Sequence, residues 1–308
     1  MVYRPIDESK AMKKRASIVF AILITAMVLV FAGFILMRGK LFSENDEGVL
    51  EEESQSFEIE PEKEIESVDL QAIVDDWANS VNGNRSVLIY DLDKGELVGS
   101  YNPDEVYNTA SLYKLFVVYE GYRRVESGAW LEDEYIGSTG QTISECLDLA
   151  IRESNSPCAE ALWAMIGHNE LDQIIEDEYK ITDSDISNLT SNASDILKIM
   201  QLFYQHPEIN DENLVGQMMD SFLNQPVTTY DWRQGLPSGF NEARVYNKVG
   251  WDYNPDGYWN IYHDAAIVEF PEENRHFIVV VMTNRVSFMK IRELGSMIEN
   301  EFLTQYYN

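Results

Sequence analysis

The stretch YNTASLYKLFVVYEGY, residues 107–122, places a serine and a lysine three positions apart, at Ser111 and Lys114. Residues at i and i+3 share one face of a helix, so the Lys114 amine can lie beside the Ser111 hydroxyl. The apolar residues after them predict a buried helix, and burial lowers a lysine pKa, so a neutral Lys114 could take the proton of a nucleophilic Ser111. The pattern S-x-x-K is weak by itself, because it occurs again at Ser287 to Lys290.

The periodicity of the chain predicts one antiparallel sheet that is flanked by helices and carries a helical insertion. The predicted elements, in chain order, are a helix at 68–81, a hairpin at 85–101, helices between 111 and 222, strands at 243–251, 262–270 and 276–284, and a helix at 288–307. The hairpin turns at Asp93-Lys94-Gly95, between two β-rich runs.

An apolar run near the N-terminus predicts a membrane anchor. Ala16 to Met37 contains no charged residue and is long enough to cross a bilayer as a helix. A signal peptide has a shorter apolar core followed by a small-residue cleavage site, so we expect an uncleaved anchor. The basic residues before it place residues 1–15 in the cytoplasm and the rest of the chain outside the cell. These basic residues are Lys10, Lys13, Lys14 and Arg15.

The segment 38–67 is rich in acidic residues and predicts an extended extracellular stalk, after which the folded domain covers 68–308. The formal net charge of −30 repels phosphate backbones and excludes nucleic acid as a partner. The histidines have no ligand spacing, so we expect neither a metal nor another cofactor. Cys146 and Cys158 are too far apart for a redox C-x-x-C site, and outside the cell we expect them to form a structural disulfide.

Two further segments complete a pattern with Ser111 and Lys114. RESNSPCAEAL, 152–162, places Ser154 at the start of a helix, and VYNKVGW, 245–251, places a K-x-G on the first late strand. S-x-x-K, a serine on a helical subdomain and K-x-G on a strand are the three elements of the penicillin-recognising serine acyltransferases. On these motifs, 68–308 resembles the class A serine β-lactamases and the D-alanyl-D-alanine peptidases. The resemblance implies an α/β fold of the α+β type, with an antiparallel five-stranded sheet flanked by helices and an all-α subdomain.

The resemblance also implies a role for each residue of the pattern. Ser111 is the nucleophile and Lys114 its base. Ser154 passes a proton to the leaving nitrogen, and Lys248 supplies positive charge for the substrate carboxylate. The backbone N–H groups of Ser111 and Trp251 are expected to form the oxyanion hole.

The sequence departs from the family's pattern at both of its later motifs. The family's S-D-N is SNS at 154–156, and its K-T-G is KVG at 248–250. Ser156 and Gly250 are therefore the substrate-binding candidates. Ser156 offers only one short hydroxyl where the family has an asparagine, and Val249 offers no hydroxyl.

The segment 168–188 lacks the glutamate that a β-lactamase uses to activate the deacylating water. It contains acids, but none in an E-x-x-L-N setting, and these acids predict solvated helix faces: Glu170, Glu176, Asp177 and Glu178. We therefore expect acylation with slow hydrolysis.

The sequence thus predicts a membrane-anchored extracellular serine hydrolase whose substrate is a β-lactam or a peptidoglycan stem peptide. The alternative is a catalytically inactive module of the same fold that binds or scaffolds at the cell surface. In that alternative Ser111 and Ser154 are only helix caps, and Lys114 and Lys248 are ordinary charges.

Overall fold

The computed structural model describes residues 67–225, 232–253 and 259–308, which belong to one compact unit. The α-helices of this part are α2 (Gln71–Ser80), α3 (Tyr113–Glu126), α4 (Ile143–Arg152), α5 (Ser156–Ile166), α6 (His168–Asp177), α7 (Ala193–Gln205), α8 (Glu212–Leu223) and α9 (Phe288–Tyr307). The strands of the main sheet are β1 (Asn84–Asp91), β2 (Glu96–Tyr101), β7 (Arg244–Tyr253), β8 (Trp259–Phe270) and β9 (Arg275–Asn284). The short elements are β3 (Tyr107–Asn108), β4 (Tyr135–Ile136), β5 (Gln141–Thr142), β6 (Thr190–Ser191) and the 3-10 turns η1 (Ala110–Leu112) and η2 (Leu236–Gly239).

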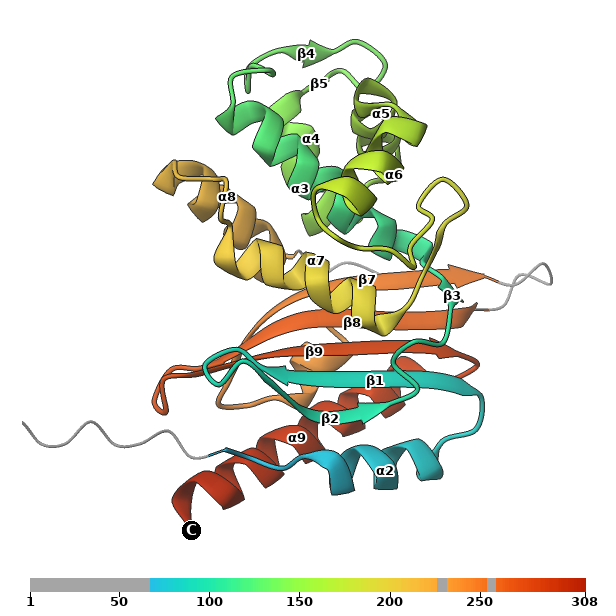
Figure 1. The fold of residues 1–308 in the computed structure, drawn as a ribbon, viewed down its shortest axis with the longest axis vertical. Helices are drawn as coiled ribbons and strands as arrows, with labels where there is room; N and C mark the ends of the chain where they lie inside the picture. Colours follow the sequence, from blue (N-terminus) through green and yellow to red (C-terminus); the bar gives the residue numbers. More distant parts are fainter. Residues whose placement is uncertain (1–66, 226–231, 254–258) are drawn as a thin grey trace, which may run out of the picture. The chain divides into compact units, whose positions relative to one another are not determined.

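The main sheet has five antiparallel strands in the order β2-β1-β9-β8-β7. The chain builds β1 and β2 first, forms the helical part, and then returns with three strands, so that β9 lies between β1 and β8 (Figure 1). The five-stranded antiparallel sheet with its helical insertion, predicted from the sequence, is confirmed. Among the described strands, β7 pairs with β8 alone and forms one edge of the sheet.

The central strand β9 is buried on both of its faces. Ile278 and Val280 belong to the core under the helical part, whereas Phe277 and Val279 belong to the core under α2 and α9. In Figure 1, α2 and α9 cover one face of the sheet and α7 lies on the other. A strand covered on both faces needs apolar residues at every position, which explains the uninterrupted run FIVVVM.

Helix α3 passes through the middle of the helical part. Every residue from Tyr113 to Tyr122 is buried, and α4, α5, α6 and α7 all contact the helix (Figure 1). A helix enclosed in this way lacks the broad polar face of a surface helix. Lys114, in its first turn, is therefore carried into the interior of the protein.

The predicted cytoplasmic tail and anchor, 1–15 and 16–37, lie outside the described residues, as does all but the last residue of the predicted stalk. Within the described part of the chain, no helix combines the length and the hydrophobicity that crossing a bilayer requires.

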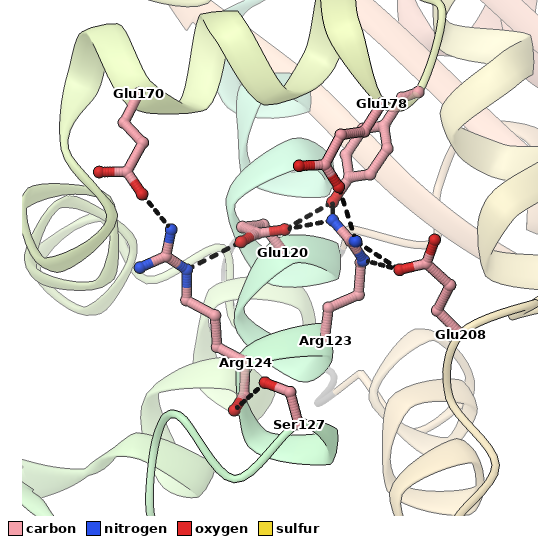
Figure 2. Close-up of polar contacts among 8 residues, drawn as sticks. Glu120, Arg123, Arg124, Ser127, Glu170, Glu178 and Glu208 are labelled. Atoms are coloured by element: carbon pink, nitrogen blue, oxygen red, sulfur yellow. Dashed lines mark hydrogen bonds and ion pairs between the residues drawn. The ribbon is translucent and has the colours of Figure 1, made fainter.

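Two arginines at the end of α3 connect this helix to its neighbours. Arg123 and Arg124 both bind the buried carboxylate of Glu120, at 2.9 and 2.8 Å. Arg124 also binds Glu170 of α6 at 2.6 Å, and Arg123 binds Glu178 at 2.8 Å (Figure 2). The acids of 168–188 that the sequence predicts to be solvated are exposed, but Glu170 and Glu178 are paired with α3. The network therefore fixes α6 against the helix that carries Lys114.

Removal of the Glu120 carboxylate should destabilise the protein far more than removal of an exposed acid in the same network. Glu208 also pairs with Arg123, but its side chain is 55% exposed, against 6% for Glu120. We expect Glu120→Ala to lower the free energy of unfolding by about 3 kcal/mol or more, because two arginines lose a buried partner. Glu208→Ala should cost less than about 1 kcal/mol. Urea denaturation of the purified variants measures both values, and equal losses would contradict this account of the network.

Candidate active site

Ser111 lies in the turn η1, two residues before α3 begins at Tyr113. It therefore precedes the helix, whereas the sequence placed it as the residue that opens the helix. Its neighbour Ala110 has a φ of 44°, a left-handed conformation that is uncommon for a residue with a Cβ atom. The Ala110 N–H donates to Oδ1 of Asn108 at 2.9 Å, which holds the turn in this shape. Strained backbone of this kind concentrates at functional sites.

The amine of Lys114 is surrounded by oxygen atoms inside the protein. The residue is 0% exposed, and its Nζ lies 3.1 Å from the Ser111 Oγ. The amine also donates to the Ser154 carbonyl at 2.5 Å, to the Ser154 Oγ at 3.3 Å and to the Ser156 Oγ at 3.0 Å. The short hydroxyl of Ser156 thus reaches the lysine. As a neutral amine, Lys114 has a lone pair that can receive the Ser111 proton.

Ser154 and Ser156 lie where α4 passes into α5. Ser154 has a φ of 54° and comes two residues before α5, so it belongs to the connecting turn. The expectation that Ser154 starts the helix is therefore wrong. Asn155 caps α5 by accepting a hydrogen bond from the Cys158 N–H at 2.9 Å. Cys158 forms a disulfide with Cys146 of α4, the pair that the sequence suggested. The cap and the disulfide together hold the turn against both helices.

Lys248 reaches the cluster from β7. Its Nζ donates to the Ser154 Oγ at 2.9 Å and to the Val249 carbonyl at 2.8 Å, and the residue is 1% exposed. The strand can approach η1 closely because Gly250 has no side chain. A Cβ atom at that position would lie 2.7 Å from the carbonyl oxygen of Thr109. Ser111, Lys114, Ser154 and Lys248, which the sequence placed in one site, therefore do lie together.

Trp251 follows Gly250, and its ring packs toward the start of α9. The ring stacks on Phe288 with centroids 5.7 Å apart and meets Tyr262 edge-on at 5.5 Å. The oxyanion hole formed by the backbone N–H groups of Ser111 and Trp251 stays a prediction. Val249 is 1% exposed, so this position presents neither a hydroxyl nor appreciable surface to a substrate.

Burial shifts both lysines toward their neutral forms. Loss of hydration lowers the pKa of Lys114 from 10.5 to about 8, although the nearby carboxylate of Glu160 acts in the opposite direction. Burial also lowers the pKa of Lys248 well below its usual value, the charge of Lys114 lowers it further, and Asp264 opposes both effects. Two amines that share the hydroxyl of Ser154 cannot both hold a proton easily, so a proton can be exchanged within the cluster.

Two buried titratable residues of β8 support the site and were not predicted from the sequence. Asp264 accepts a hydrogen bond from the Asn247 side chain at 2.9 Å, and burial raises its pKa to about 7. His263 accepts from the Thr283 N–H at 2.9 Å and donates from Nε2 to the Asn108 carbonyl at 2.8 Å. Burial lowers the pKa of His263 to about 4. Only the pairing of β8 with β7 and β9 brings these residues behind the site, so no local pattern could have indicated them.

Carboxylates of the segment 178–192, between α6 and α7, bind residues outside the cluster. Within the described residues, Glu178 of this segment binds Arg123, and Asp185 accepts from the Asn188 side chain at 2.7 Å. No acid of the segment is hydrogen-bonded to Ser111 or to its lysine.

The second S-x-x-K copy, Ser287 to Lys290, lies at the start of α9 and has a different environment. The Lys290 side chain is 40% exposed and binds Glu293 at 2.6 Å. In Figure 1, α9 covers the face of the sheet opposite to α7. The tertiary structure therefore separates a buried lysine among serines from a surface lysine in an ordinary ion pair.

Comparison with known proteins agrees with this arrangement. The model of a family described as the Beta-lactamase enzyme family matches residues 68–302. This chain belongs to that family. Comparison with curated proteins finds no significant match.

Solved structures of β-lactamase-family proteins have the same fold. An ancestral class A β-lactamase is 17% identical, with a TM-score of 0.63, and the match covers 75% of this chain and 99% of that one. A class A β-lactamase from Bacteroides cellulosilyticus is 13% identical, with a TM-score of 0.64 over 75% of this chain and 96% of that one. PBP-A is 17% identical, with a TM-score of 0.64 over 77% of this chain and 99% of that one. At these identities, the similarity shows the fold alone.

Proposed function

We propose that this β-lactamase-family protein is a membrane-anchored serine hydrolase that works outside the cell and forms an acyl-enzyme at Ser111. Its substrate is a β-lactam or a D-alanyl peptide of peptidoglycan. The observation that carries the proposal is the buried amine of Lys114, 3.1 Å from the Ser111 Oγ and hydrogen-bonded to Ser154. A base that is buried, partly neutral and aligned with a hydroxyl is the arrangement that activates a serine nucleophile.

Acylation can be assigned to the residues of the cluster. The Ser111 oxygen attacks the carbonyl carbon of the lactam or peptide bond while its proton passes to neutral Lys114. The new C–O bond forms and the C–N bond breaks, and Ser154 relays the proton from Lys114 to the leaving nitrogen. Lys248 binds the same hydroxyl, and in its protonated form it adds positive charge for a substrate carboxylate. Water then hydrolyses the ester and restores the Ser111 hydroxyl.

The structure supports slow release of the acyl group. Among the described residues, no carboxylate is hydrogen-bonded to Ser111, Lys114 or Ser154, and the segment 168–188 lacks a glutamate in the E-x-x-L-N setting. Val249 also lacks the hydroxyl that would bind a substrate carboxylate. These features favour a peptidase or a slow hydrolase over an efficient β-lactamase. They are also the features expected of an inactive binding module, although the intact contacts between the serines and the lysines favour an enzyme.

The proposed location follows from the sequence before the described domain. The apolar segment Ala16–Met37, preceded by basic residues, is of the length and charge asymmetry that anchor a single-pass protein. Carbonate washing should leave the full-length chain in the membrane pellet and release a chain that lacks residues 1–40. Protease added to intact cells should degrade the domain, and protection of the domain would contradict the proposed orientation.

Replacement of the nucleophile tests the reaction directly. Ser111→Ala should abolish covalent labelling by a fluorescent penicillin, whereas Ser287→Ala, in the second S-x-x-K copy, should label like the wild type. Mass spectrometry after penicillin treatment then measures the lifetime of the adduct. A stable adduct indicates a peptidase-like enzyme or a slow hydrolase, and a transient adduct indicates a faster hydrolase. No adduct on the wild-type protein would favour the binding module and contradict the proposal.

The rate of acylation should depend on the charge of Lys114. The amine accepts a proton only in its neutral form, and its pKa is lowered by burial to about 8. We therefore expect the second-order labelling rate to rise with pH up to about 8, and to fall about tenfold for each unit below this value. Stopped-flow measurements with a chromogenic β-lactam give this profile. A flat rate between about pH 6 and 8 would exclude Lys114 as the base that limits acylation.

A further inference from the structure

A carboxylate on α5 is tied to the S-x-x-K turn from outside the cluster. Glu160 lies one helical turn after Ser156, whose hydroxyl binds the Lys114 amine at 3.0 Å. The Oε1 atom of Glu160 accepts a hydrogen bond from the Tyr113 hydroxyl at 2.7 Å. Tyr113 immediately precedes Lys114 in α3. Glu160 is thus hydrogen-bonded to the residue that precedes the candidate base in the chain.

The tyrosine that holds Glu160 is itself fixed. Tyr113 is 5% exposed, and its ring packs against Trp163 of α5 with centroids 5.2 Å apart. The Lys114 Nζ lies 5.7 Å from the centre of the same ring. Burial and the adjacent Glu160 both raise the pKa of the Tyr113 hydroxyl, so it stays protonated and remains a donor. The buried Tyr113, which is next to Lys114 in the chain, therefore fixes the exposed Glu160 carboxylate by a hydrogen bond.

The other charged or titratable groups around Lys114 do not supply this negative charge. In the described part of the chain, Lys248 on β7 is coupled to Lys114, and Asp264 on β8 acts on Lys248. His168, at the start of α6, packs on Trp163 with ring centroids 4.2 Å apart. Among the described residues, Glu160 is the one carboxylate found to raise the pKa of Lys114, against the lowering by burial.

We propose that Glu160 is a positioning residue for acylation, which acts on the Lys114 amine through its negative charge and is held in place by Tyr113. This inference rests on the proposed roles of Ser111 and Lys114. A nearby negative charge favours the ammonium form, so Glu160 makes Lys114 a stronger proton acceptor and raises the pH at which the amine becomes neutral. Glu160 does not touch the reacting atoms and acts only through the lysine.

The pH profile of acylation tests this role. In the full-length protein, Glu160→Gln removes the charge but keeps a side chain of the same shape. We expect the pH below which the labelling rate falls to decrease by roughly 0.5 unit, a size typical of the loss of one nearby charge that is partly screened by water. The plateau rate should fall by only a small factor. If Glu160 has only a structural role, the substitution should lower the rate at every pH without changing the pH at which the rate begins to fall.

Two further variants distinguish the effect of the Glu160 charge from that of its hydrogen bond with Tyr113. Tyr113→Phe keeps the carboxylate but removes its hydrogen bond, so the pH below which the rate falls should decrease by a smaller amount. Glu176→Gln removes an exposed acid of α6 and should leave the profile unchanged. Because Glu160 is exposed, high salt should narrow the difference between the wild type and Glu160→Gln.

A titration without substrate keeps this inference separate from the proposed function. NMR of protein carrying 13C-labelled lysine, with the Lys114 signal assigned by its loss in Lys114→Met, compares the lysine pKa in the wild type and in Glu160→Gln. A lower pKa in the variant supports the role of Glu160 even if labelling is never observed, in which case only the proposed function fails. An unchanged pKa, or an unchanged pH dependence in a protein that labels normally, would overturn the role of Glu160.

Discussion

The buried amine of Lys114 is the interaction on which the rest of the site depends. A lysine removed from water is tolerated only where other polar atoms replace its hydration shell. The oxygen atoms of Ser111, Ser154 and Ser156 do this, at 2.5 to 3.3 Å. The burial that makes the lysine costly also lowers its pKa to about 8, which turns the amine into a base near neutral pH. One environment therefore accounts for both the geometry of the cluster and its chemistry.

The partners of this amine come from separate segments of the chain, and different local interactions hold each segment in place. The left-handed Ala110 and the Asn108 side chain shape the turn that carries the nucleophile. A helix cap and a disulfide hold the turn between α4 and α5, and a glycine lets β7 approach η1. The Glu120 network fixes α3 against α6 at the opposite end of the helix. Reactive groups held by rigid elements lose little entropy when a substrate binds.

The arrangement is more complete for acylation than for hydrolysis. The contacts among the two serines and two lysines are present, whereas the segment 178–192, which is described throughout, makes no hydrogen bond to the nucleophile or to Lys114. The α5 carboxylate of Glu160 acts on the base instead, through its charge. The fold is shared with an ancestral class A β-lactamase and with PBP-A, but a shared fold does not fix the rate at which an acyl group is released. Which chemistry a member of the fold performs is decided by such local groups.

Local patterns in the sequence determined much of this protein. Apolar periodicity indicated the five strands and the helical insertion, and the spacing of Ser111 and Lys114 indicated that their side chains meet, although Ser111 lies in the turn before the helix. The tertiary structure alone decided that this S-x-x-K copy is buried while Lys290 is exposed. It also revealed Glu160 and Asp264, and it showed that Ser154 lies in a turn before its helix. Burial and long-range contacts depend on how distant segments pack, and no window of neighbouring residues contains that information.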